Sequence, residues 1–103
     1  MDSVTVFIPE ENQFSIYIPN VFTPNGDLVN NIFYVYGENI KDFSLLIFNR
    51  WGELIFESND ILKGWNGEYK GVPAPMGTYV YIVKFTGAEG AYELRTGKVD
   101  LIR

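Results

Sequence analysis

The feature that most constrains the fold is a pair of apolar runs joined by four turn residues, Asn49 to Gly52. The runs, residues 45–48 and 53–57, are rich in leucine, β-branched and aromatic side chains, which are typical of strands. Asn and Gly tolerate the positive φ angles that tight turns between antiparallel strands need. A helix fits less well, because Gly52 would fall in its middle and the apolar residues do not repeat every 3.6 positions. The stretch therefore predicts a β-hairpin.

The tip of this hairpin carries two side chains that a turn does not require, Arg50 and Trp51. Arg and Trp are enriched among the residues that dominate binding energy at protein interfaces. Trp51 could equally fold back over the end of the core, with Arg50 solvated, because aromatic side chains often close a sandwich. The sequence leaves both interpretations open.

Further short strands are expected on both sides of the hairpin, separated by Pro, Gly and Asn turns. The expected strands are residues 4–8, 14–18, 32–36, 43–49, 53–57, 78–85 and 92–102. The strand at 43–49 is apolar on both faces, which predicts an interior position in a sheet. Seven or eight short strands without a convincing helix predict an all-β fold, an immunoglobulin-like β-sandwich. Its core is expected to include Phe43, Leu45, Ile47, Tyr81, Val83 and Leu101.

The last expected strand contains a break in its alternation of apolar and polar residues. Tyr92 and Leu94 are at even positions, whereas Val99 and Leu101 are at odd positions. Because side chains alternate between the two faces of a strand, one inserted residue would bring all four onto one face. Gly97 is therefore expected to form a β-bulge.

Composition indicates one globular domain and disfavours several functional classes. The 103 residues are 47% hydrophobic, and a chain of this size can bury about two-thirds of its surface. The net charge of −5 disfavours binding to nucleic acid or to anionic membranes. No apolar run approaches the ~20 residues of a membrane span, so no direct lipid insertion is expected. The start does not resemble a signal peptide, which indicates a cytoplasmic chain or one cut from a longer secreted protein.

Catalytic and metal-binding residues are scarce. The chain has no histidine and no cysteine, its serines have strand or turn contexts, and its carboxylates are scattered. No enzyme activity and no cofactor are therefore expected. The loop Asn25–Asn31 loosely resembles a calcium loop, but only Asp27 supplies a carboxylate. An Asx-type turn is favoured over a metal site there.

Trp65 lies between turn residues in the motif Gly64–Gly67. It could stack on a sugar or on a protein partner. A core position is favoured, because a lone Trp between turn residues is more often buried.

Four motifs in order carry a family resemblance. They are Ile18–Asp27, Ile47–Ser58, Gly64–Gly67 and Pro73–Tyr81, followed by a terminal Leu101–Arg103. Together they resemble the gliding-motility-associated C-terminal domain, the type B sorting domain of the type IX secretion system. The resemblance covers residues 16–103, and residues 1–15 are expected to be an N-terminal strand or the tail of a preceding domain. Leu28 and Asn31 replace a Gly and an Asp of the family's first loop, which further weakens the metal interpretation.

The resemblance implies a non-catalytic C-terminal secretion signal of a large cell-surface or secreted protein, often an adhesin. It implies export across the outer membrane and a partner in the type IX translocon, a porin-like outer-membrane protein. The isolated domain is expected to be a monomer. An adhesive or carbohydrate-binding module is the alternative, with Trp51, Trp65 and surface tyrosines as a stacking platform. A structural spacer is a third, weaker option.

Strand directions predict that most of these motifs gather at one end of the sandwich. If the strand at 43–49 runs antiparallel to that at 32–36, its tip lies beside the loop that follows Phe22. The strand at 78–85 then begins at this end, and the last strand returns to it. The expected partner-binding face comprises Phe22, Pro24, Asn25, Arg50, Trp51 and Arg103.

Overall fold

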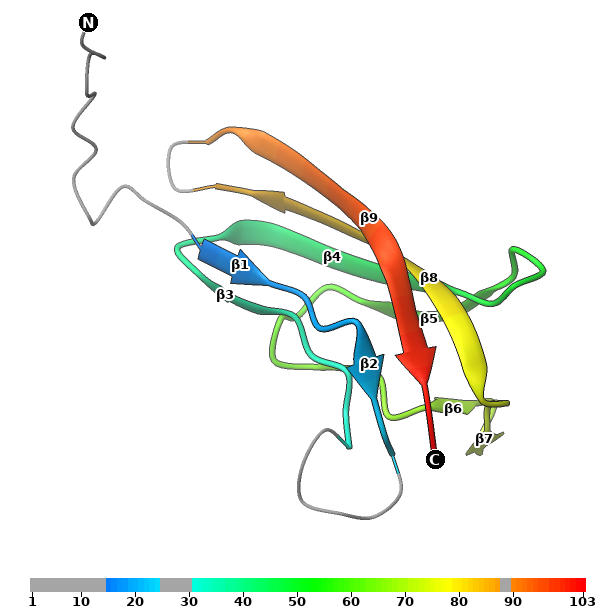
Figure 1. Cartoon of the computed structure of the whole chain (residues 1–103). Helices are drawn as coiled ribbons and strands as arrows, with labels where there is room; N and C mark the ends of the chain where they lie inside the picture. Colours follow the sequence, from blue (N-terminus) through cyan, green and yellow to red (C-terminus); the bar gives the residue numbers. More distant parts are fainter. Residues whose placement is uncertain (1–14, 25–30, 88–89) are drawn as a thin grey trace, which may run out of the picture.

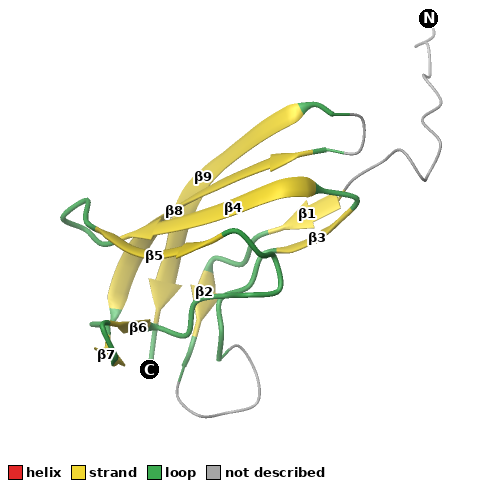
Figure 2. Ribbon diagram, turned by 180° about the vertical axis from the view of Figure 1, so that it is seen from behind, coloured by secondary structure: helices red, strands yellow, loops and turns green. Residues whose placement is uncertain are grey.

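The chain forms two packed layers of β-structure, seen in a computed structural model that describes residues 15–24, 31–87 and 90–103 (Figures 1 and 2). The strands are β1 (Ser15–Tyr17), β2 (Val21–Phe22), β3 (Tyr36–Glu38), β4 (Lys41–Phe48), β5 (Leu54–Ser58), β6 (Glu68–Tyr69), β7 (Val72–Pro73), β8 (Gly77–Thr86) and β9 (Tyr92–Leu101). The fold is an all-β sandwich of immunoglobulin-like type, as expected. Within the described residues there are nine strands rather than seven or eight, because β2, β6 and β7 are two-residue strands without a sequence signal.

The larger sheet has five strands in the order β2-β9-β8-β4-β5. Strand β4 pairs antiparallel with both β8 and β5, which confirms its interior position. Strand β9 runs antiparallel to β8 and ends at the same end of the sheet as the tip that joins β4 to β5 (Figure 1). Strand β2 lies parallel to the last residues of β9 and forms the other edge.

The second layer is formed by β1 and β3 together with extended segments around Phe33 and Trp65. Consecutive strands β1 and β2 pair with different sheets, so the chain crosses between the layers at residues 18–20. The strand expected at 32–36 begins only at Tyr36. Phe33 instead exchanges two backbone hydrogen bonds with Trp65, at 2.8 and 3.0 Å, which directs it away from the pairing with β1. The strand expected at 4–8 lies outside the described residues.

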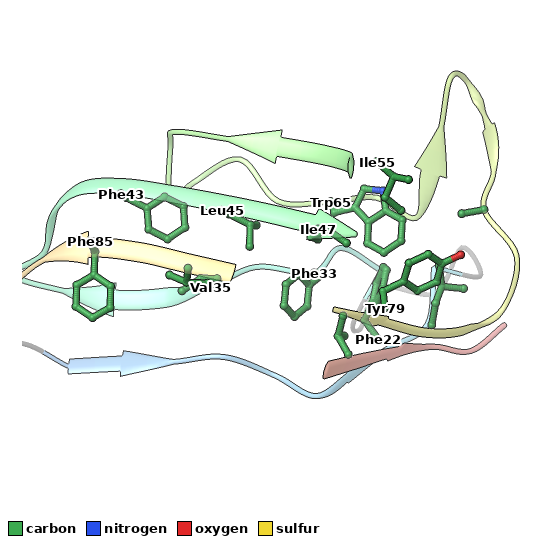
Figure 3. Close-up of a cluster of buried hydrophobic side chains, with 14 residues drawn as sticks. Phe22, Phe33, Val35, Phe43, Leu45, Ile47, Ile55, Trp65, Tyr79 and Phe85 are labelled. Atoms are coloured by element: carbon green, nitrogen blue, oxygen red, sulfur yellow. The ribbon is translucent and has the colours of Figure 1, made fainter. Parts of the chain in front are cut away.

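The core between the layers extends along the whole sandwich (Figure 3). Its buried residues are Phe22, Phe33, Val35, Phe43, Leu45, Ile47, Ile55, Trp65, Ala74, Tyr79, Val83, Phe85, Val99 and Leu101. Five of the six residues expected in the core are among them. The sixth, Tyr81, is half-buried and packs against the same cluster.

The β-bulge expected at Gly97 is absent. Strands β8 and β9 pair without a register shift from Gly77 opposite Leu101 to Thr86 opposite Tyr92. Val99 and Leu101 point into the core, whereas Tyr92 is left exposed on the other face. Gly97 has a different role: the ring of Tyr81, its cross-strand neighbour, lies where a Cβ of residue 97 would be. The register shifts of this sheet lie instead along β4, between Lys41 and Ser44 against β8 and between Ile47 and Phe48 against β5.

The outer face of the five-stranded sheet is also apolar near its centre. Leu46 and Phe48 of β4 are half-buried there, opposite Ile82 and Val80 of β8. This arrangement accounts for the apolar residues on both faces of β4. The inner face packs on the second layer, and the outer face gives each side chain apolar neighbours across the strands.

Candidate functional site

The tip between β4 and β5 is held by the side chain of Asn49. Its Oδ1 accepts hydrogen bonds from the backbone N–H groups of Trp51 and Glu53, both at 2.9 Å. Gly52 has φ 81°, a left-handed conformation that glycine adopts at little cost. These local interactions explain the turn, and they confirm the predicted hairpin. They do not involve the side chains of Arg50 and Trp51, which remain available for another purpose.

Trp51 projects from the tip and is 80% exposed, so it does not close the core. The guanidinium carbon of Arg50 lies 5.7 Å from the centre of the Trp51 ring, within the range of a cation–π contact. The structure therefore contradicts the interpretation in which Trp51 folds back over the end of the core. An exposed Trp beside an exposed Arg is a combination found at protein interaction surfaces.

A cleft of about 380 Å³ lies beside this tip. Its opposite wall is the segment from Ala74 to Thr78, which leads into β8, and Ile55, Tyr69 and Tyr79 also line it. The hydroxyl of Tyr79 donates a hydrogen bond of 2.6 Å to the carbonyl of Pro75, which fixes this wall. Gly77 has φ 145°, and the position of a Cβ on it would be 3.6 Å from Nη2 of Arg50. The arginine head therefore lies directly beside a backbone segment without a side chain.

The C-terminal arginine lies at the same end of the sandwich. Nη2 of Arg103 donates a hydrogen bond of 3.1 Å to the carbonyl of Gly67. Gly67 has φ 85°, and the ring of Pro24 occupies the space where its Cβ would be. Pro24 and Arg103 are thus joined through the motif Gly64–Gly67, whose position the sequence did not predict.

Electrostatics link the two arginines through Tyr79. Burial raises the pKa of the Tyr79 phenol, while the guanidinium groups of Arg103 and Arg50 act in the opposite direction. Both positive charges therefore act at the same buried hydroxyl. The structure brings Arg50 and Arg103 to one end, as the strand directions predicted. Asn25 lies outside the described residues.

Phe22 and Trp65 lie in the core behind this end (Figure 3). Phe22 is 2% exposed, and its ring centre lies 5.3 Å from that of Trp65. Trp65 is fully buried, and its indole N–H donates to the carbonyl of Glu68 at 2.9 Å. The predicted core position of Trp65 is confirmed. Phe22 cannot contribute to an exposed face, because the strand pairing of β2 with β9 directs its side chain inward.

The structure adds Met76 and Tyr69 to the site, which sequence reasoning did not select. Met76 is 53% exposed on the wall opposite Trp51, and Tyr69 donates a hydrogen bond to Oε2 of Glu53 at 2.9 Å. Met76 directly precedes Gly77 within a motif that the sequence did single out. That proximity was the one signal that could have indicated it.

A metal centre finds no support in the part of the chain that the structure describes. No three His, Cys, Asp or Glu side chains come close enough there to hold an ion. The loop Asn25–Asn31 lies almost entirely outside the described residues. Those residues also contain no helix that could cross a membrane.

The sequence matches the CHU_C type IX secretion signal domain over residues 16–100. The chain belongs to this family. The match agrees with the resemblance that the motifs suggested. It identifies this domain as a signal for type IX secretion. A comparison with curated proteins gives no match. The protein that carries this domain is therefore one exported by type IX secretion.

Proposed function

We propose that this CHU_C domain is a non-catalytic sorting signal that directs a longer protein through the outer-membrane translocon to the cell surface or the medium. A folded signal has to be read from its surface, since its core is hidden. The partner would be a translocon component, a porin-like outer-membrane protein. The proposal rests on family membership for the role and on one structural observation for the site.

That observation is the gathering of exposed residues from distant segments at one end of the sandwich. Trp51 is exposed although the turn does not need it, and Arg50 and Arg103 act on the same tyrosine. A structural spacer would have no use for an exposed Trp, because water-exposed apolar surface adds little to folding stability. We assign the contact surface to Pro24, Arg50, Trp51 and Arg103. Phe22 supports it from the core.

The test is export of a soluble reporter fused to the full chain, in a cell with type IX machinery. The unaltered fusion should appear outside the cell, and the double variant Arg50→Ala, Trp51→Ala should be retained while remaining folded. Tyr92→Ala is a matched control, because Tyr92 is also an exposed aromatic residue, at 65%, but does not line the cleft. Export of the double variant at the normal level would refute the assigned surface, and failure of the unaltered fusion would refute the sorting function.

A second candidate function is glycan binding, which a groove of about 620 Å³ favours. The groove is lined by β1, β3 and residues 61–62. Tyr17 and Tyr36 are both exposed there, with ring centres 6.1 Å apart. Such rings could stack on a glycan in an adhesive module. Trp65, once considered for that platform, is unavailable because it is buried. Binding on a glycan array that is lost in Tyr17→Ala would support this function over sorting alone.

A further inference from the structure

The polar side-chain groups around the cleft between the β4–β5 tip and residues 74–78 are hydrogen-bonded within the described residues with two exceptions, the guanidinium group of Arg50 and the indole N–H of Trp51. The hydroxyls of Tyr69 and Tyr79 donate to Glu53 and Pro75, and the hydroxyl of Thr78 donates to Asp100 at 2.7 Å. Asn49 uses its Oδ1 for the turn and donates from Nδ2 to Glu53 at 3.0 Å. These groups have no need of a ligand. They therefore provide rigid walls around Arg50 and Trp51.

Of these two, Arg50 is the single charged residue among the described residues that line the cleft. Within the described part of the chain, its guanidinium group makes no hydrogen bond or ion pair, and its contact is with the ring of Trp51. Glu53, the nearby anion, already accepts hydrogen bonds at both oxygens. A guanidinium group offers five N–H donors in a planar fork that matches a carboxylate. Arg50 thus presents an unused carboxylate-binding group at the mouth of the cleft.

The rest of the lining is apolar and can be approached closely. Ile55, Ala74, Pro75 and Met76 contribute aliphatic surface, and methionine adapts its shape to different partners. Gly77 leaves the backbone uncovered beside the Arg50 head. A cleft with an apolar floor and one guanidinium at its rim fits a ligand with an apolar side chain next to a carboxylate.

Charge favours one class of occupant. At the cleft itself the charge is positive, because Arg50 is the one charged residue of its described lining, in a chain with net charge −5. A nucleic acid or an anionic lipid would be repelled by the rest of the domain. A second copy of the chain would carry the same net charge, and the two would repel each other. An extended segment of another protein can place a single carboxylate beside Arg50 and keep the rest of its chain away from the acidic surface of the domain.

We propose that the cleft binds an extended acidic segment of a protein partner, with a carboxylate paired to Arg50 and a neighbouring apolar side chain against Met76. The identification of that partner with the secretion machinery rests on the proposed function. The binding chemistry does not depend on it. The two can therefore be tested separately.

The binding test uses amide chemical shifts of the full chain titrated with the capped peptide Gly-Asp-Phe-Asp-Gly. Shifts should concentrate at residues 49–53 and 74–79, and binding should weaken with added salt. The neutral peptide Gly-Asn-Phe-Asn-Gly should bind about tenfold more weakly or worse, as expected for the loss of a charged hydrogen-bond partner. Arg50→Gln should weaken the acidic peptide by a similar factor. Lys41→Gln, which removes the same charge at the far end of β4, should change nothing.

Equal binding of the acidic and neutral peptides, or an undiminished affinity in Arg50→Gln, would overturn the proposal. Dimerisation of the chain that is abolished by Arg50→Gln would also overturn it, in favour of a second copy as the occupant. The export assay separates this inference from the proposed function. If the unaltered fusion is not exported but the acidic peptide still binds through Arg50, the sorting function fails and the carboxylate site stands. If the fusion is exported and Arg50→Gln alters neither peptide binding nor export, the carboxylate site fails and the sorting function stands.

Discussion

Replacing Gly97 with Ala should destabilise the domain, although alanine is ordinarily the better residue within a strand. A Cβ at this position would overlap the hydroxyl and the ring of Tyr81, the cross-strand partner in β8. The ring cannot move freely, because its centre lies 5.9 Å from that of the buried Phe33. Introducing a methyl group into a packed site costs about 1–3 kcal/mol. Removing a strand glycine returns about 0.5–1 kcal/mol.

At the central values of about 2 and about 0.75 kcal/mol, the expected net loss is about 1 kcal/mol of unfolding free energy. This corresponds to a melting temperature lower by about 4–8 °C. Urea unfolding with an unchanged m-value would measure it. The decisive comparison is the same substitution in a Tyr81→Val background. There the ring is gone, so Gly97→Ala should be neutral or stabilising by up to about 1 kcal/mol.

Two results would refute this reasoning. One is a Gly97→Ala variant as stable as the unaltered chain while Tyr81 is present. The other is an equal loss in both backgrounds, which would indicate that the backbone at residue 97, and not the Tyr81 ring, requires glycine. The second result would restore the interpretation of Gly97 as a special backbone position.

Three further predictions concern the core, pH and calcium. Ile47→Ala should lower the free energy of unfolding by about 2–5 kcal/mol in denaturant melts, because Ile47 is fully buried. A loss below about 1 kcal/mol, or one no larger than that of Leu46→Ala on the outer face, would contradict this prediction. Burial raises the pKa of both Tyr79 and Tyr81 above the usual 10.0. The unfolded chain therefore loses these protons first. The contribution of the two tyrosines to stability should be constant below about pH 10 and be lost as pH rises through their folded pKa values. Tyr79→Phe should reduce that alkaline loss, and an unchanged profile would argue against it. Millimolar calcium should leave the melting temperature unchanged, because the loop 25–31 supplies one carboxylate; a strong rise reversed by chelator would overturn this.

The sequence by itself determined the elements that depend on near neighbours. The hairpin follows from strand formers on either side of Asn49 and Gly52, and the structure shows that these residues form the turn through their own side chain and backbone. The alternation along β4 and β8 placed Phe43, Leu45, Ile47 and Val83 in the core. The family motifs, read in order, indicated the secretion signal. The hairpin and the core positions use information within a few residues along the chain, where side-chain period and turn chemistry act.

Tertiary structure decided everything that depends on which distant segments meet. Trp51 and Trp65 both lie among turn residues, yet the first is exposed and the second is buried against Phe22 and Tyr79. The sequence favoured a buried Trp65 but left Trp51 open, because burial is set by partners more than ten residues away. Gly97 was misread for the same reason: the contact that requires glycine comes from Tyr81 on another strand. The cleft beside Arg50 also exists only in the folded chain. Strands β5, β6 and β7 separate its two walls along the sequence, and the walls meet only when β4 and β8 pair.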